Sequence, residues 1–403
     1  MEKSNKKWRV VFGAVLLQVC LGAIYSWSLF NQPLMDKFGW TDDQVVLTYS
    51  IAIFVFAFST IFSGRLADKI GPRKVATIGG VLYGSGMILA SLASTLPMLY
   101  FSYGVLAGAG VGFAYVCPLS TGIKWFPEKK GFITGIVVGA FGAGSLIFKS
   151  VIEFFIENTG VSATFLCLGI ICMVLVVIGA QFLIFPKVSA KDATNKNTGE
   201  NSYTAKEMIK TKSFYMVWIM FMFGCMPGLL VISLAKDIGI EMVKLTPVTA
   251  AHAVGLIALF NAGGRLVWGT ISDKLGCVKV VTMMFIMTVV ALLVMSLVQL
   301  NYEMFFLCLA AIAFSYGGVL AVFPTITGQF FGPKNLGANY GIIYQAYGIA
   351  ALVGPIIKGN SKDLNQTFLV AAGFAIIGLV MSLFVKAPVQ NIVTIETTHS
   401  KAI

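Results

Sequence analysis

Arg265 lies in the apolar stretch Ile257–Lys274, where a charged side chain needs an explanation. An arginine at the centre of a membrane costs on the order of 2.5–3.5 kcal/mol on insertion scales, so it is expected to face a cavity or a partner. The residue one turn earlier is Asn261, which carries no compensating charge. Because a guanidinium is a planar fork of donors, it matches a carboxylate. The sequence therefore predicts that Arg265 binds a ligand carboxylate, with a structural salt bridge to Glu153 or Asp237 as the alternative.

The composition indicates a membrane protein. The chain of 403 residues is 57% hydrophobic and 11% charged, with a mean hydropathy of +0.86, whereas soluble domains are about 45–50% apolar and about 25% charged. The sequence contains no phosphate-binding loop of the form G-x-x-x-x-G-K-[ST], and its seven cysteines lack metal-ligand spacing. We expect a polytopic membrane protein that is not an enzyme, uses no metal or cofactor, and draws its energy from an ion or substrate gradient.

Hydrophobic runs of about 20 residues recur along the chain, and each can cross a hydrocarbon core of about 30 Å as a helix. Twelve such helices are expected, at residues 9–31, 44–64, 75–95, 98–122, 131–155, 162–184, 213–236, 247–268, 279–299, 303–326, 337–357 and 366–386. The fold class is therefore an all-α membrane protein. Arg265 precedes Asp273, at the end of the eighth helix, by eight residues. At about 1.5 Å per residue this is roughly 12 Å of depth, close to the midplane.

Lysine and arginine are distributed unevenly between the two sides of this arrangement. With the N-terminus inside, most of the 29 Lys and Arg residues fall on inner segments. This bias sets the orientation, and it explains the net charge of +12 without a nucleic-acid partner. The first apolar run is longer than the roughly 7–15 residues of a signal-peptide core, so an uncleaved first helix is expected. We expect a monomer in a bacterial or archaeal inner membrane, with both termini cytoplasmic and the lipid bilayer as its surroundings.

The chain divides into two similar parts. An N-terminal six-helix bundle is expected over residues 1–186, a cytoplasmic central loop over 187–211, a second six-helix bundle over 212–388, and a cytoplasmic tail over 389–403. The sequence "GRLADKIGPRK" begins at Gly64, and "GTISDKLGCVK" begins at Gly269. A second echo links "KWFPEKKG" with "QFFGPKNLG" at nearly the same spacing. Thr204 and Glu207 form a capping-box pattern before the seventh helix. Two parallel six-helix repeats are typical of one large class of transporters.

The repeated loop resembles the signature loop of the major facilitator superfamily. The first copy is complete, and the second has Val278 in place of the arginine. The resemblance implies a cytoplasmic latch between the halves, in which charged groups pair in one state and separate in another. The latch residues are Gly64, Asp68, Lys69, Gly71, Arg73 and Lys74 in the first copy, and Asp273, Lys274 and Gly276 in the second. The alternative is that these residues only anchor the inner side.

Further motifs narrow the resemblance. "YSWSLFNQP", "KWFPEKKG", "FNAGGRLVWG" and "FPTITGQFFG…NYG" are similar, in this order, to the bacterial oxalate/formate antiporter family, a relative of the monocarboxylate transporters. The resemblance implies that Arg265 binds the substrate carboxylate and that nearby polar and aromatic side chains line the site. These are Tyr25, Tyr115, Asn261, Tyr316, Tyr344 and Tyr347. Glycines in "GAFGAG" (Gly139–Gly144) predict close approach of the fifth helix to its neighbours.

Departures from the family pattern bear on the substrate. Oxalate-carrying members have a lysine where this chain has Tyr347, and Leu320 and Tyr316 replace a tyrosine and a tryptophan. One cation at the midplane matches a monoanion and leaves a dianion under-compensated. We therefore expect a secondary transporter for a small monocarboxylate of the pyruvate, lactate or formate class, working by alternating access. An oxalate/formate-type exchanger and a transporter-like carboxylate sensor are the alternatives.

The coupling mechanism has three candidate residues. Lys149 and Glu153 are four residues apart on one helix and are expected to pair, with a gate or proton role as the alternative. His252 is expected at the outer rim, and it could instead couple transport to protons because histidine titrates near neutral pH. Monocarboxylate transporters have an aspartate one turn before the arginine, where this chain has Asn261. Because asparagine does not titrate, both exchange and symport by another route remain open.

Overall fold

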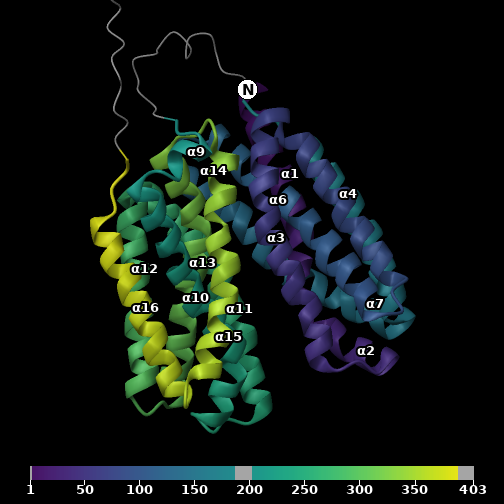
Figure 1. Ribbon diagram of the computed structural model, residues 1–403, viewed down its shortest axis with the longest axis vertical. Helices are drawn as coiled ribbons and strands as arrows, with labels where there is room; N and C mark the ends of the chain where they lie inside the picture. Colours follow the sequence, from purple (N-terminus) through teal and green to yellow (C-terminus); the bar gives the residue numbers. More distant parts are fainter. Residues whose placement is uncertain (1, 187–201, 389–403) are drawn as a thin grey trace, which may run out of the picture.

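The computed structural model describes residues 2–186 and 202–388, and over these residues the chain consists of helices and their connections. Most of the expected central loop and the whole expected tail, residues 187–201 and 389–403, lie outside the described residues. The helices form two bundles, one from each half of the sequence (Figure 1).

The first bundle is built from the N-terminal half. Its helices are α1 (Glu2–Gly22), η1 (Ala23–Ser26), α2 (Ser28–Phe38), α3 (Asp42–Ile70), α4 (Pro72–Ser91), α5 (Leu96–Leu99), η2 (Tyr100–Ala107), α6 (Gly108–Trp125) and α7 (Lys130–Gln181). The long helix α7 is interrupted at Gly160, whose φ of +79° favours glycine because a side chain would clash with the backbone there. It therefore supplies two passes, which were expected as the fifth and sixth helices.

The second bundle is built from the C-terminal half. Its helices are α9 (Ala205–Met208), α10 (Lys212–Glu241), α11 (Pro247–Leu275), α12 (Cys277–Leu297), α13 (Tyr302–Phe331), α14 (Leu336–Ile343), α15 (Gln345–Asn360) and α16 (Leu364–Phe384). The short helix α9 begins with the predicted capping box. Thr204 N–H donates to the Glu207 carboxylate at 2.7 Å, and Glu207 N–H donates to the Thr204 hydroxyl at 3.3 Å.

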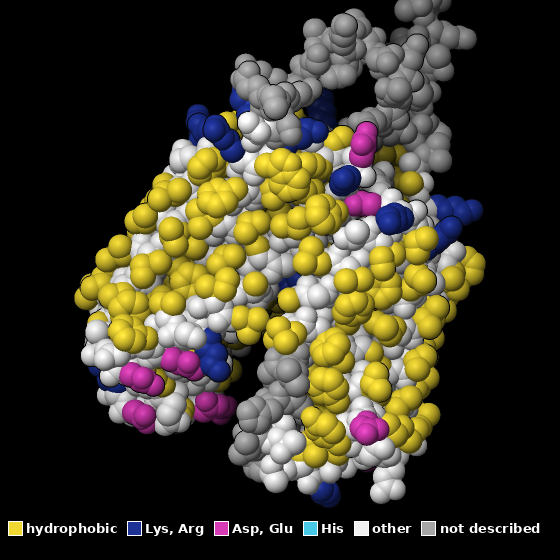
Figure 2. Space-filling view, turned by 180° about the vertical axis from the view of Figure 1, so that it is seen from behind, with side chains coloured by type: hydrophobic (Ala, Val, Ile, Leu, Met, Phe, Trp, Pro, Cys, Tyr) yellow, Lys and Arg dark blue, Asp and Glu magenta, His cyan; other side chains and the backbone are white. Residues whose placement is uncertain are grey.

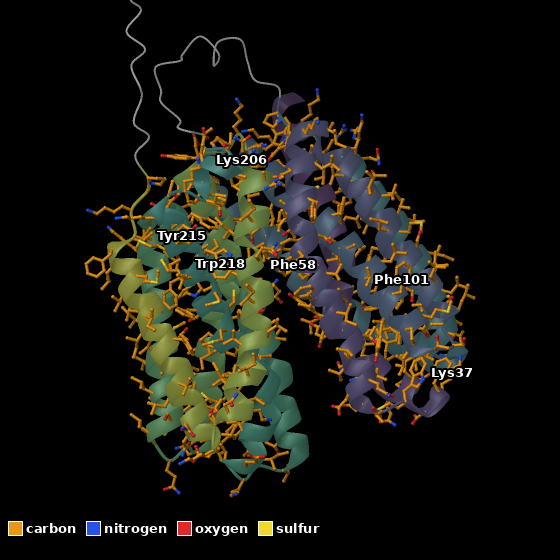
Figure 3. All side chains as sticks on the ribbon, viewed as in Figure 1. Lys37, Phe58, Phe101, Lys206, Tyr215 and Trp218 are labelled. Carbon is orange, nitrogen blue, oxygen red and sulfur yellow. The ribbon has the colours of Figure 1, made fainter. Side chains whose placement is uncertain are left out.

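Nine helices within the described residues are long and apolar enough to cross a membrane. One of them is α7, which makes two passes, and the long helices α4 and α11 supply the remaining two. The twelve-pass arrangement predicted from the hydrophobic runs is thus confirmed. Large apolar side chains such as Phe101 and Tyr215 are exposed on the outer surfaces of the two bundles (Figure 3), where lipid would cover them.

Several passes are less regular than the apolar runs predicted. The first pass breaks at η1, which contains Tyr25, before continuing as α2. The fourth contains the π-helical turn η2, and the eleventh breaks at Tyr344 between α14 and α15. The apolar runs did not predict these interruptions. Two of the breaks fall at tyrosines that were predicted to line the site, so the irregular backbone lies beside candidate functional residues.

The two bundles touch at one end of the molecule and diverge toward the other (Figure 1). We call these the closed end, where α3 and α11 finish at Ile70 and Leu275, and the open end. Figure 2 shows the hollow between the bundles at the open end, a broad hydrophobic band across the visible face of both bundles, and many Lys and Arg side chains at the closed end. An apolar band bounded by charged ends is the surface expected of a protein surrounded by lipid.

Candidate ligand site between the two halves

The carboxylate of Asp68 links the two halves at the closed end. It accepts a hydrogen bond from the backbone N–H of Ala338 at 2.9 Å, near the start of α14 in the other bundle. The same carboxylate pairs with Lys124 Nζ at 3.0 Å. Since the first N–H groups of a helix have no partner within the helix and carry partial positive charge, Asp68 caps α14.

Asp273 makes the equivalent contact in the opposite direction. Its two carboxylate oxygens accept from the backbone N–H groups of Gly131 and Phe132 at 2.7 and 2.8 Å, at the start of α7. Each aspartate of the repeated loop therefore caps a helix of the opposite half. Glycines allow the helices to meet closely here, because a Cβ at Gly64 would clash with the Gly337 carbonyl, and one at Gly131 with the Gly269 carbonyl.

The other residues of the predicted latch lie beside these caps. Gly71 and Gly276 adopt φ of +96° and +88° at the tight connections that follow α3 and α11, a region that favours glycine. Arg73 donates to the Gln181 carbonyl within its own half, and Lys69, Lys74 and Lys274 are exposed. The ion-pair partner of Asp68 is thus Lys124 rather than a basic residue of its own loop. Lys124 belongs to "KWFPEKKG", a motif noted for its repetition and for the family resemblance but not as part of the latch.

Arg265 is buried between the halves, with 2% of its surface exposed. Its Nε donates to Asn261 Oδ1 at 3.0 Å, and its Nη1 donates to the backbone carbonyl of Val138 on α7 at 2.5 Å. Two of the five N–H donors of the guanidinium are therefore used within the protein. Its Nη2 makes no hydrogen bond to any residue that the structure describes. Glu153 lies instead beside Lys149, with an N–O distance of 3.8 Å.

The predicted tyrosines gather around this arginine. Tyr25, Tyr115 and Tyr316 come from both halves, and Tyr316 precedes Gly317, where a Cβ would lie 3.3 Å from Cγ of Arg265. Tyr25 and Tyr347 join the halves through a hydrogen bond between their hydroxyls at 2.9 Å. Tyr344 packs between Tyr115 and Tyr347, with ring centroids 4.9 and 5.2 Å away. The fold thus brings residues of η1, α6, α11, α13 and α15 to one place.

Two phenylalanines complete the aromatic wall, and the sequence did not single them out. Phe141 on α7 packs edge-on against Tyr25 and Tyr115, with centroid distances of 5.1 and 5.2 Å. Phe56 on α3 packs against Tyr115 at 5.1 Å and Tyr344 at 5.3 Å. Each is one of 32 phenylalanines in a mostly apolar chain, so neither its type nor its spacing distinguishes it.

A cavity of about 210 Å³ adjoins this cluster at Tyr347. Its lining comes from both halves and is mainly apolar, with Ile53 and Phe54 from α3, Leu229 from α10, and Ala351 from α15. Such a cavity can accept an apolar group, while the hydroxyls and Arg265 offer hydrogen bonds beside it.

None of the three candidate coupling residues has a described contact with the cluster around Arg265. Lys149 and Glu153 form the expected pair on the surface, with 59% and 45% of their side chains exposed. Such an exposed pair contributes at most about 1 kcal/mol. His252 belongs to α11, but its side chain lies outside the part that the structure describes.

Comparison with known proteins places these features in a family. A family model of the Major Facilitator Superfamily matches residues 11–355. The chain is 36% identical over 347 residues to the uncharacterized MFS-type transporter YhjX of Escherichia coli, covering 86% of each chain. It is 29% identical over 385 residues to the oxalate:formate antiporter of Oxalobacter formigenes, covering 94% of this chain and 91% of that one.

A solved structure shows the same fold. The proton:xylose symporter XylE aligns with a TM-score of 0.73 at 14% identity, over 95% of this chain and 97% of that one. These matches agree with twelve helices in two repeated halves, and they confirm the prediction of a transporter rather than an enzyme. The chain belongs to the Major Facilitator Superfamily and is a multi-pass membrane transporter.

Proposed function

We propose that this transporter carries a small monocarboxylate of the pyruvate, lactate or formate class by alternating access, and that Arg265 binds the carboxylate. The observation that carries the proposal is the unused Nη2 of a buried arginine at the contact between the halves, which a hydrogen bond between the hydroxyls of Tyr25 and Tyr347 also joins. A carboxylate there would receive charge-assisted hydrogen bonds, which are roughly twice as strong as neutral ones.

Charge matching supports a monoanion over a dianion. Arg265 is the one Lys or Arg side chain that is buried among those the structure describes. Tyr347, which stands where the oxalate/formate family pattern has a lysine, donates to or accepts from Tyr25 and brings no charge. One cation leaves the second carboxylate of oxalate without a counter-charge, which is costly in a buried site. The cavity beside Tyr347 provides room for a short apolar group.

The arrangement also suggests a state and an orientation. Since Lys and Arg residues gather at the closed end, the positive-inside rule supports a cytoplasmic closed end. The structure would then be open to the outside of a bacterial or archaeal inner membrane. Residues 1–186 and 212–388 would be the two moving bodies, and the caps at Asp68 and Asp273 would hold the cytoplasmic side shut.

Counterflow in proteoliposomes tests the substrate class. Purified protein is loaded with unlabelled formate, pyruvate, lactate or oxalate, and uptake of each labelled anion is measured. We expect exchange of at least one monocarboxylate and weaker exchange of oxalate. An oxalate exchanger is the second candidate, favoured by the similarity to the oxalate:formate antiporter along nearly the whole chain. Tight exchange of oxalate with none of the three monocarboxylates would establish that second candidate instead.

A further inference from the structure

Gly142 lies on α7 of the N-terminal half, in contact with the guanidinium of Arg265 from the C-terminal half. A Cβ built at Gly142 would lie 2.6 Å from Nη1, 2.7 Å from Cζ and 3.1 Å from Nη2 of Arg265. These are its three nearest neighbours, and carbon atoms of a side chain do not approach other groups this closely. The guanidinium thus occupies the space that any other residue at 142 would fill.

The missing side chain also explains how Arg265 reaches a backbone carbonyl. In an α-helix the carbonyl of residue 138 accepts the N–H of residue 142 and keeps a second lone pair. Side chains on a helix tilt toward its N-terminus, so a side chain at 142 would cover the carbonyl one turn earlier. With glycine there, Val138 can accept Nη1 of Arg265 at 2.5 Å.

We propose that Gly142 is a positioning residue, which lets Arg265 dock on the opposite half and tie α11 to α7 until the closed end opens. The part of this proposal that concerns carboxylate binding rests on the proposed function. When the halves separate at the closed end, the tie breaks, and a bound carboxylate takes the donor that Val138 leaves. The same guanidinium therefore serves the ligand and the contact between the halves.

Another contact between the halves shows why this tie responds to an anion. Between α3 and α15, Gln345 Nε2 donates to the Ala57 carbonyl at 2.6 Å, again from the C-terminal half to a backbone carbonyl of the N-terminal half. Gln345 is neutral, whereas Arg265 is charged. An anion in the site therefore competes with the Val138 carbonyl for Arg265. It does not attract Gln345, so the Gln345 contact is unaffected by the charge of the anion.

Gly142→Ala tests the proposal, and Gly139→Ala is the matched control because a Cβ at Gly139 meets no atom within 4 Å. In the Gly142→Ala variant a carboxylate no longer has to break a charge-assisted hydrogen bond, which corresponds to roughly a tenfold gain of affinity or more. We expect this gain for carboxylate binding by Gly142→Ala, at nearly unchanged insertion and melting temperature, and wild-type binding by Gly139→Ala. Equal or weaker binding by Gly142→Ala, or equal changes in both variants, would overturn the proposal.

A second measurement needs no ligand. Ser272, 1% exposed at the closed end, is replaced by cysteine, and the rate of its labelling by a thiol reagent is compared with that of the parent protein. Gly142→Ala should speed labelling, and it should add nothing in an Arg265→Gln background, where the tie is already absent. Additive effects would refute the tie. A wild type that binds no carboxylate, with non-additive labelling, would refute the proposed function and leave the tie supported.

Folding of the variant has its own control. If Gly142→Ala fails to insert, the double variant with Arg265→Gln should recover insertion, because the closest atoms all belong to Arg265. Failure of the double variant as well would show that Gly142 is needed for the packing of α7 itself, and would overturn the positioning role.

Discussion

At the scale of single residues, Arg265 is a charged side chain in a buried position. Its contacts within the protein leave some of the guanidinium donors unused. Asn261 holds Nε and the Val138 carbonyl holds Nη1, so the guanidinium has a fixed orientation before any ligand arrives. Fixing the donors in advance reduces the entropy lost on binding. In the proposed mechanism, the arginine is therefore oriented for a carboxylate before the ligand binds.

Replacing Arg265 tests this role directly. Arg265→Gln should abolish carboxylate binding and transport while the protein remains folded and inserted, since no described carboxylate loses a counter-charge. Arg265→Lys should also be poor, because an ammonium lacks the planar fork. Binding and counterflow are measured on protein whose insertion is verified by size-exclusion chromatography. Near-normal uptake by Arg265→Gln would remove Arg265 from the site.

In the proposed mechanism, the residue at position 347 determines whether the site carries one or two positive charges. Tyr347→Lys would add a second cation next to Tyr25 and should shift the preference toward oxalate. Full activity is not expected, because Leu320 lacks the hydroxyl of the family pattern. The ratio of oxalate to pyruvate affinity is compared between this variant and wild type, with Tyr347→Phe as the uncharged control. A ratio that rises equally in Tyr347→Phe would show that charge is not the cause.

At the scale of helices, the closed end depends on two aspartates that each cap a helix of the opposite half. The cap of Asp68 is reinforced by Lys124, whereas Asp273 places both oxygens on backbone N–H groups. Helix caps of this kind contribute typically about 1 kcal/mol each. Since such contacts exist only while the closed end is shut, they bias the populations of the two states more than the affinity of either one.

Asparagine at these positions should change the balance between states. Asp273→Asn keeps one acceptor for two N–H groups, and Asp68→Asn loses the charge opposite Lys124. Each should favour opening of the closed end by about 1 kcal/mol, or roughly fivefold in the population ratio. The transport rate should fall with a modest change in substrate affinity. Thiol labelling at Ser272→Cys reports the population, and an affinity loss at an unchanged maximal rate would contradict this role.

At the scale of the whole molecule, the two halves are repeats that meet at the closed end and part at the open end. Lys37 and Lys206 lie at opposite ends of the molecule and are both exposed (Figure 3). Cysteine at either position should therefore be reachable from one side of the membrane only. This difference gives a direct test of the proposed orientation.

Labelling intact cells distinguishes the two orientations. A membrane-impermeant thiol reagent should label Lys37→Cys in intact cells and Lys206→Cys only after the membrane is permeabilised, because we place the closed end in the cytoplasm. The parent protein corrects for its seven native cysteines. The reverse pattern would invert the proposed topology and make the structure inward-open.

The sequence by itself determined the twelve passes and the repeat, and it singled out Arg265 as a charge within an apolar helix. The length of an apolar run can be counted along the sequence, and a charged residue within the run is recognised without knowing which residues contact it in the fold. The breaks at Tyr25 and Tyr344 could not be foreseen from apolar length, since they lie within continuous hydrophobic runs. The repeated loop identified Asp68 and Asp273, but it did not indicate that Lys124 is the ion-pair partner of Asp68.

Only the tertiary structure decided what these residues contact. The caps on α14 and α7, the docking of Arg265 on Val138 and the space left by Gly142 all join residues from different halves. Such contacts depend on how one bundle faces the other, and backbone N–H and carbonyl groups look the same at every position of a sequence. Glycine in membrane helices is common, so Gly142 acquires its meaning only when the guanidinium of the other half is seen to lie against it.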